Sequence, residues 1–218
     1  MIEQKIRKNK EVLALIRKGN ANLGAMGYTD HSEAHAAMVA DRAAYILKKP
    51  DYPEKDIELV KIAGWMHDIG NAINRTHHAE YGALLANDIL KETDIGMEDR
   101  ITVVSAIGHH DESTGGATDP VSAALIIADK TDVRRSRVRE KNEATFDKHD
   151  RVNYAVIDAK LKVDTEKHVI ALNLQIDTKI CTMYEYFEIF LGRMMMCRGA
   201  ADVLGMTFKL TANGSKVL

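Results

Sequence analysis

The chain has 218 residues, enough to bury a sizeable core in one domain or in one domain with a smaller appendage. It carries 30 Lys and Arg against 32 Asp and Glu, and this net charge of −2 excludes a global field that would draw nucleic acid or an anionic membrane. Its 2 cysteines are too few for a disulfide framework, and no apolar run reaches membrane-spanning length. We therefore expect a soluble protein of the cytoplasm that binds neither nucleic acid nor a membrane.

Apolar residues recur at helical spacing near the start of the chain and predict two helices. The first covers residues 3–18 and stops at a glycine. The second begins at Asp30, whose spacing to Glu33 resembles a capping box, and ends at a Lys-Lys-Pro sequence. This helix would place His31 and His35 one turn apart on one face.

Four further helices are predicted between Pro53 and residue 139. Pro53 stands in a first-turn position and opens a helix that should end near the pair His67 and Asp68. The last of the four has Asp119 and Pro120 as its start signal. The three that follow the His-Asp pair are expected over residues 78–91, 98–110 and 119–139.

Beyond Lys148 the apolar residues alternate in the manner of half-buried strands. A helix rich in methionine and aromatic residues follows, and we interpret its apolar residues as core or as a subunit contact that favours a homo-oligomer. The fold class is therefore mainly α, with a helical domain at residues 1–148 and a small α+β subdomain at residues 149–218. The elements expected in the second part are strands over 152–157, 159–163 and 169–176, a helix over 181–204 and a strand over 206–210.

Seven histidines and aspartates form an ordered set of nitrogen and oxygen ligands for a divalent transition metal. They lie near the ends of, or within, separate predicted helices. Seven ligands exceed what one ion with an open position needs, so we expect at least two ions. In chain order the residues are His35, His67, Asp68, His78, His109, His110 and Asp129.

The order H…HD…H…HH…D resembles the HD-domain superfamily of metal-dependent phosphohydrolases, and the sequence His-Asp-Ile-Gly at residues 67–70 resembles its HDIG subgroup. The resemblance covers roughly residues 25–135 and implies an HD-type helical bundle. It also implies two ions, of Fe, Mn, Co, Ni or Zn, that share Asp68 and hold a bridging hydroxide for attack on phosphorus. Asp68 and His67 would then be the catalytic residues, which agrees with the absence of a nucleophile motif. The first ion would add His35, His67 and Asp129, and the second His78, His109 and His110.

The sequence indicates the residues that would bind the phosphate less clearly than it indicates the metal ligands. Lys130, Arg134 and Arg137 follow the last ligand and are candidates, although a run of charges is usually a solvated face. Many HDIG proteins have lysine where this chain has Asn71, and Lys130 or Arg75 could replace that cation. The Gly-Tyr-Pro sequence of cyclic-di-GMP phosphodiesterases is also absent, which argues against a cyclic dinucleotide.

Single histidines outside this set allow several interpretations. His31 could be an extra metal ligand, a group that supports the ligands or a residue of the helix start, and His77 is equally open. We interpret His149 and His168 as core or surface residues, because that is the common role of an isolated histidine.

Three functions fit these observations. The first is a phosphohydrolase acting on a small phosphorylated substrate, with a nucleotide as one candidate. The second keeps the metals but changes the reaction, because similar ligand sets in some relatives hold two irons and activate dioxygen. The third is a binding or regulatory protein in which the metal only stabilises the fold. The resemblance of fold alone does not select the substrate.

Overall fold

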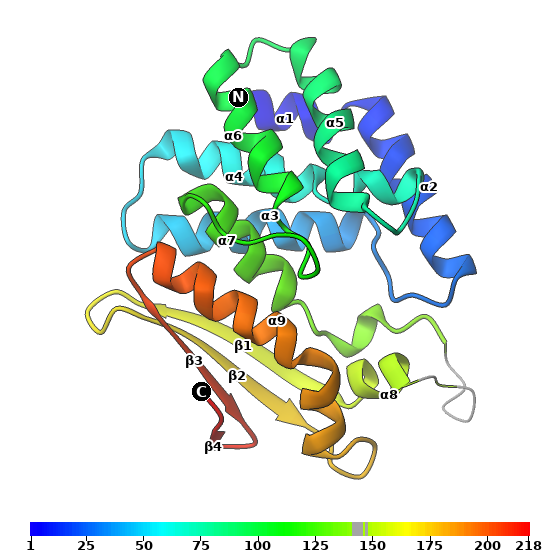
Figure 1. Cartoon of the computed structure of the whole chain (residues 1–218), viewed down its shortest axis with the longest axis vertical. Coiled ribbons are helices and arrows are strands. Elements are labelled where there is room, and N and C mark those ends of the chain that lie inside the picture. Colours follow the sequence, from blue (N-terminus) through cyan, green and yellow to red (C-terminus); the bar gives the residue numbers. More distant parts are fainter. Residues whose placement is uncertain (141–145, 147) are drawn as a thin grey trace.

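Helices make up the first two thirds of the protein, and a small sheet with one long helix on its face makes up the rest (Figure 1). The computed structural model describes residues 1–140, 146 and 148–218. Within them no helix is both long enough and apolar enough to cross a membrane. The mainly α fold class predicted from the sequence is confirmed, including the small α+β part at the end of the chain.

The helical part is held together by packing of helix pairs. Helix α3 lies against α4, α5 lies against α6, and α7 packs on both α3 and α4. Apolar residues of α4 and α7 are almost wholly buried, as expected for central helices. The bounds are α1 (Ile2–Arg7), α2 (Lys10–Ala25), α3 (Glu33–Lys48), α4 (Glu54–Met66), η1 (Ile69–Ala72), α5 (His78–Lys91), α6 (Met97–Gly108) and α7 (Pro120–Lys130).

The single helix expected over residues 3–18 is in fact two helices. Asn9 interrupts it, because its side chain accepts hydrogen bonds from the backbone of Glu11 and Val12 and so starts a new helix. Helix α2 then continues through Gly19 instead of stopping there. A Cβ atom at Gly19 would lie 3.1 Å from the backbone nitrogen of Ala72, so this glycine serves the close approach of α2 to η1.

The start of α3 also differs from the prediction. Ser32, and not Asp30, caps this helix, since its hydroxyl accepts from the backbone of Ala34 at 3.3 Å. The Asp30 carboxylate accepts instead from the Ser32 hydroxyl at 2.6 Å. His31 therefore precedes α3 and is not one helical turn before His35 within it.

Helix α7 ends at Lys130, nine residues before the end expected from the sequence. Thr131 terminates it, and its hydroxyl donates to the carbonyl of Ile127 at 2.6 Å. The following Asp132 is 1% exposed and bonds to side chains outside the helix, which turns the chain away from the helix axis. A short 3-10 turn, η2 (Arg135–Arg137), follows. The start of α7 agrees with the prediction, since Asp119 and Ser122 form a capping box.

In the C-terminal part, the described residues form a four-stranded sheet in the order β1-β2-β3-β4. Strand β1 pairs antiparallel with β2, β2 pairs parallel with β3, and β3 pairs antiparallel with β4. Helix α9 connects the parallel pair and packs on α7, so it lies between the sheet and the helical part (Figure 1). The bounds are α8 (Lys148–Tyr154), β1 (Val156–Asp164), β2 (Val169–Ile176), α9 (Met183–Val203), β3 (Thr207–Ala212) and β4 (Ser215–Lys216).

The strand predicted over residues 152–157 is largely wrong. Residues up to Tyr154 belong to α8, in which the Asn153 amide donates back to the carbonyl of His149 at 2.8 Å. The remainder joins the next predicted strand in one β1, with an irregularity in register between Val156 and Asp158. A short alternation of apolar residues fits one turn of helix as well as a strand, so the sequence could not separate the two.

Candidate metal centre

Six of the predicted ligands come together where helices end or begin. His35 lies in the first turn of α3, and Asp129 lies in the last turn of α7. His67 directly follows α4 and Asp68 precedes η1. The other two are His78, the first residue of α5, and His110, which follows α6 by two residues. Because each side chain is fixed at the end of an element, the cluster depends on how these helices pack.

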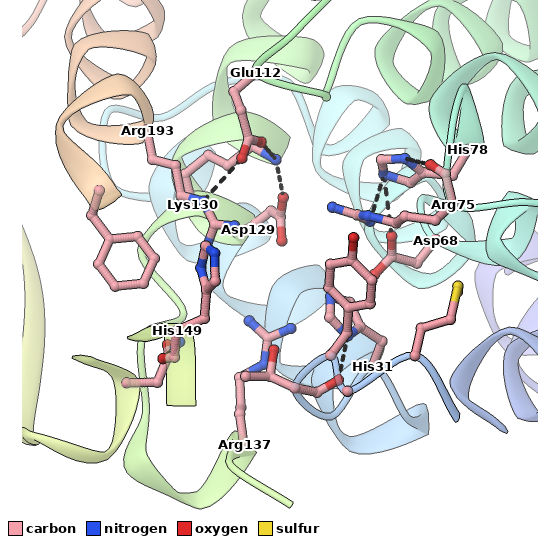
Figure 2. A pocket seen from close by; sticks show the side chains of 16 residues that line it. His31, Asp68, Arg75, His78, Glu112, Asp129, Lys130, Arg137, His149 and Arg193 are labelled. Atoms are coloured by element: carbon pink, nitrogen blue, oxygen red, sulfur yellow. Dashed lines mark hydrogen bonds and ion pairs between the residues drawn. The ribbon is translucent and has the colours of Figure 1, made fainter. Parts of the chain in front are cut away.

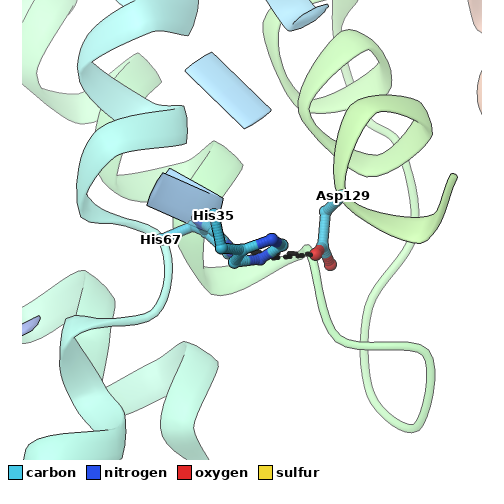
Figure 3. Close-up of side chains that lie close together, drawn as sticks. All are labelled: His35, His67 and Asp129. Carbon is cyan, nitrogen blue, oxygen red and sulfur yellow. Dashed lines mark ion pairs between the residues drawn. The ribbon is translucent and has the colours of Figure 1, made fainter. Parts of the chain in front are cut away.

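Four ligand atoms from this cluster face one another on one side. His35 Nε2 lies 3.4 Å from Asp129 Oδ1 and 3.6 Å from Asp68 Oδ2, and His67 Nε2 lies 3.7 and 3.2 Å from the same two oxygens. Figure 3 shows His35, His67 and Asp129 directed toward each other. We call these three residues and Asp68 the first ligand set.

The first ligand set leaves buried polar atoms without partners. Among the described residues, His35 Nε2, His67 Nε2 and Asp68 Oδ2 are buried and make no hydrogen bond. A buried polar atom without a partner is costly, so native proteins rarely keep several in one place. Imidazole nitrogens and carboxylate oxygens at these distances fit a divalent transition metal ion.

A second ligand set lies on the other side of Asp68. Its Oδ1 atom is 3.6 Å from His78 Nε2 and 4.0 Å from His110 Nε2. The two oxygens of Asp68 therefore face different histidines, which is the arrangement that a carboxylate needs to bridge two ions.

The four histidines are oriented by the nitrogen that faces away from the cluster. In each ring an oxygen accepts from Nδ1, which fixes the tautomer and leaves Nε2 with a lone pair directed inward. The Nδ1 contacts are His35 with Asp132 Oδ2 (2.7 Å), His67 with the Gly64 carbonyl (2.8 Å), His78 with the Arg75 carbonyl (3.1 Å) and His110 with the Ile107 carbonyl (2.6 Å).

His109, the seventh predicted ligand, does not join the cluster. Its side chain is exposed, its Nδ1 bonds to the Ser105 carbonyl at 2.9 Å, and it lines a groove beside α5 and α6 instead. Successive residues at the end of a helix point about 100° apart, so only one of His109 and His110 can face the centre. The sequence contained both histidines but not the rotation of α6 that chooses between them.

Of the four histidines outside the predicted set, His31 and His149 line the cavity beside the centre, whereas His77 and His168 do not. His31 is close to the cluster, with its ring 5.4 Å from that of His35 and its Nδ1 2.7 Å from the Thr29 carbonyl. Burial lowers the pKa of His31 well below its usual value, so it is neutral. His77 is exposed beside Glu80, and His168 is exposed in the turn between β1 and β2. His149 lines the cavity beside the centre (Figure 2), a position that the sequence did not indicate.

The cavity over the centre has a volume of about 250 Å³ and is lined by several cations (Figure 2). Lys130 is paired with Asp129 Oδ2 at 2.7 Å and with Glu112 at 2.8 Å. Arg137 donates to the carbonyls of Asp30 and Asp132. Both were predicted as phosphate-binding residues, and both line the cavity while bonding to the protein.

Arg134, the third predicted phosphate-binding residue, does not line the cavity. Its guanidinium donates to Asp132 Oδ1 at 2.6 Å and Oδ2 at 3.1 Å. The prediction assumed that α7 continued to Arg139. In such a helix Arg134 would lie about one turn beyond Asp129. Because α7 ends at Lys130, Arg134 lies behind the ligands and bonds to the partner of His35.

Sequence reasoning missed Asp132, Glu112 and Arg193. Asp132 bonds to His35, and Glu112 joins Lys130 to Arg193 of α9. Burial would raise the pKa of Asp132, but hydrogen bonds from His35 and Arg134 hold it well below its usual value. The only signal for Asp132 was an aspartate three residues after the last ligand, and Arg193 lies too far along the chain to have been connected with the site.

The charge of His67 depends on its two carboxylate neighbours. Burial lowers the pKa of His67, but the carboxylates of Asp68 and Asp129 outweigh burial and raise it above its usual value. Because an ion needs the lone pair of Nε2, metal binding at His67 should strengthen as the pH rises.

Replacing Asp132 by alanine should lower the affinity of the first ligand set for a metal ion about 10- to 100-fold, because His35 loses the acceptor that orients its ring. The dissociation constant for Mn²⁺, measured by calorimetry on the metal-free protein, checks this. Asp132→Asn keeps an oxygen acceptor and should lose less. Equal affinities for the wild type and Asp132→Ala would show that Asp132 does not position His35.

Comparison with known proteins supports the same kind of site. The family model of the HD domain matches residues 33–157, more than half of the chain and all the residues of the two ligand sets. An uncharacterized protein of Methanocaldococcus jannaschii, MJ1020, is 30% identical over 162 residues, which are 64% of this chain and 62% of the relative. The chain thus spans less than two thirds of the length of this relative.

Proposed function

Because the chain belongs to the HD domain family, we propose that it hydrolyses a phosphate ester with the help of two divalent transition-metal ions bound by the two ligand sets. The family is one of metal-dependent phosphohydrolases, and the buried His and Asp cluster fits a metal site. The observation that carries the proposal is the position of Asp68, whose two oxygens face different histidines.

The ions would supply the nucleophile from water and neutralise the charge of the phosphate, so no serine or cysteine nucleophile is needed. The protein contributes the positions of the ligands. Lys130 pairs with Oδ2 of Asp129 and so leaves Oδ1 directed toward His35 and His67. Because both Asp129 and Glu112 accept from Lys130, this lysine orients a ligand and is not free to bind a phosphate.

The walls of the cavity suit a small phosphorylated substrate with a flat organic part. Arg75, Arg137 and Arg193 supply positive charge. Tyr28 and Phe190 supply aromatic surface from opposite parts of the chain. Ligand sites combine apolar walls with a few polar groups in this way, and a nucleotide is the candidate that uses both.

The proposal is tested by purifying the protein without oxygen, measuring its metals and assaying a panel of phosphoesters with Mn, Fe, Co, Ni and Zn. We expect hydrolysis to require an added transition metal and to place ¹⁸O from labelled water on the released phosphate. Label in a different product, or consumption of dioxygen during turnover, would favour a di-iron oxygenase. The absence of turnover with every metal would contradict the hydrolase proposal and favour a binding protein.

A further inference from the structure

We propose that Arg75 competes with an ion for the second ligand set, so that the two metal positions fill one after the other and with different affinities. This inference rests on the proposed function, since it concerns the ions of that centre. Figure 2 shows the Arg75 side chain reaching into the cavity beside His78 and Asp68.

Arg75 donates to the nitrogen lone pair of His78 that a metal ion would need. Its Nη1 lies 3.3 Å from His78 Nε2, while His78 Nδ1 is turned toward the Arg75 carbonyl. With its proton on Nδ1, His78 accepts a hydrogen bond from the guanidinium through Nε2. A nitrogen lone pair cannot bind a proton donor and an ion together, so a metal at His78 must displace Arg75.

Asn71 has a similar effect on the bridging carboxylate. Its Nδ2 donates to Asp68 Oδ1 at 2.8 Å and to the Asp68 carbonyl at 3.0 Å. The oxygen of Asp68 that faces the second ligand set therefore has a partner, whereas the other oxygen has none.

The two ligand sets thus differ before any ion arrives. In the first, no side chain from outside the set bonds to His35 Nε2, His67 Nε2 or Asp68 Oδ2, so an ion displaces no other residue there. In the second, an ion must break contacts that Arg75 and Asn71 already make. Losing a hydrogen bond between a neutral and a charged group weakens binding about 10- to 100-fold, which sets the expected difference between the two affinities.

Among the cations of the cavity wall, Arg75 is also the one best placed to bind a phosphate when an ion displaces it from His78. Lys130 and Arg193 share Glu112, and Arg137 lies 3.7 Å from a carboxylate oxygen of Asp132. Arg75 pairs with no carboxylate among the described residues, and its guanidinium lies 5.4 Å from the centre of the Tyr28 ring. A guanidinium without a carboxylate partner can bind two phosphate oxygens through its parallel N–H groups. The same side chain would therefore leave His78 as it binds a phosphate.

The test is calorimetric titration of the metal-free, full-length protein with Mn²⁺. We expect two binding steps in the wild type, the second about 10- to 100-fold weaker than the first. Arg75→Ala should strengthen the second step toward the first and leave the first unchanged. Arg75→Lys keeps the charge but shortens the donor group, and it should give an intermediate second step.

The matched control is Arg193→Ala, which removes another cation of the cavity wall but no contact to His78. This variant should keep the difference between the steps if direct contact matters, and lose it if only the total charge matters. Two equal steps in the wild type, or a second step that Arg75→Ala leaves unchanged, would overturn the inference and leave the proposed function standing. A wild type that binds no ion would overturn both. Circular dichroism of each variant confirms that the comparison is made between folded proteins.

Discussion

Asp68→Ala should remove both metal ions and lower phosphoester hydrolysis by orders of magnitude, because the ligand sets share this one carboxylate. The side chain is polar and packs beside unsatisfied nitrogen atoms, so its loss should change the helical content little. Metal content measured by plasma mass spectrometry, together with the rate on the best phosphoester, checks the expectation. Circular dichroism checks that the helices remain.

Two variants sharpen the test of Asp68. Asp129→Ala should remove the ion of the first ligand set and leave the second set intact, since Asp129 contacts only His35 and His67 among the ligands. Asp94→Ala removes an exposed carboxylate that pairs with Lys5 and should change neither metal content nor rate. Two ions at full occupancy in Asp68→Ala would contradict the bridging role.

Gly70→Ala should destabilise the protein by more than about 3 kcal/mol and abolish metal binding. A Cβ atom at residue 70 would lie 2.0 Å from the carbonyl oxygen of His78 and 2.5 Å from the backbone nitrogen of Gly82. Both are backbone atoms of α5, so they can yield only if the helix moves. That movement would separate His78 from Asp68, which sits two residues before the glycine.

Urea denaturation, monitored by circular dichroism, measures this loss in the free energy of unfolding. The matched control is Gly199→Ala in α9, where a new Cβ would meet no atom within 4 Å. Alanine is favoured over glycine inside a helix by about 1 kcal/mol, so this control should keep or raise stability. A Gly70→Ala protein with the stability of the wild type would show that η1 and α5 are not held as closely as the structure has them.

Local signals in the sequence were sufficient to predict where most helices begin and end. Helix α5 has the predicted bounds, and α4 begins after Pro53 and ends beside His67 as expected. These elements follow from the spacing of apolar residues and from the residues at their ends, which act over one or two turns. The candidate ligands were also readable, because their residue types and order carry the chemistry.

Signals that compete over a short range explain the errors. Asn9 splits the first helix because its side chain offers the backbone a local alternative to helical bonding. Residues 152–154 were assigned to a strand, although three alternating residues fit both structures. Helix α7 was extended too far because no residue within it marks the end; the stop depends on Asp132 meeting His35 and Arg134.

The sequence by itself determined the helical fold class, the positions of most helices and the set of nitrogen and oxygen ligands, since periodicity and side-chain chemistry are properties of the chain. Only the tertiary structure decided which ligands meet. The rotation of α6 turns His110 inward and His109 outward, and the packing of α9 on α7 brings Arg193 to Glu112. Such choices depend on the angle and depth at which elements pack, and no local pattern records them.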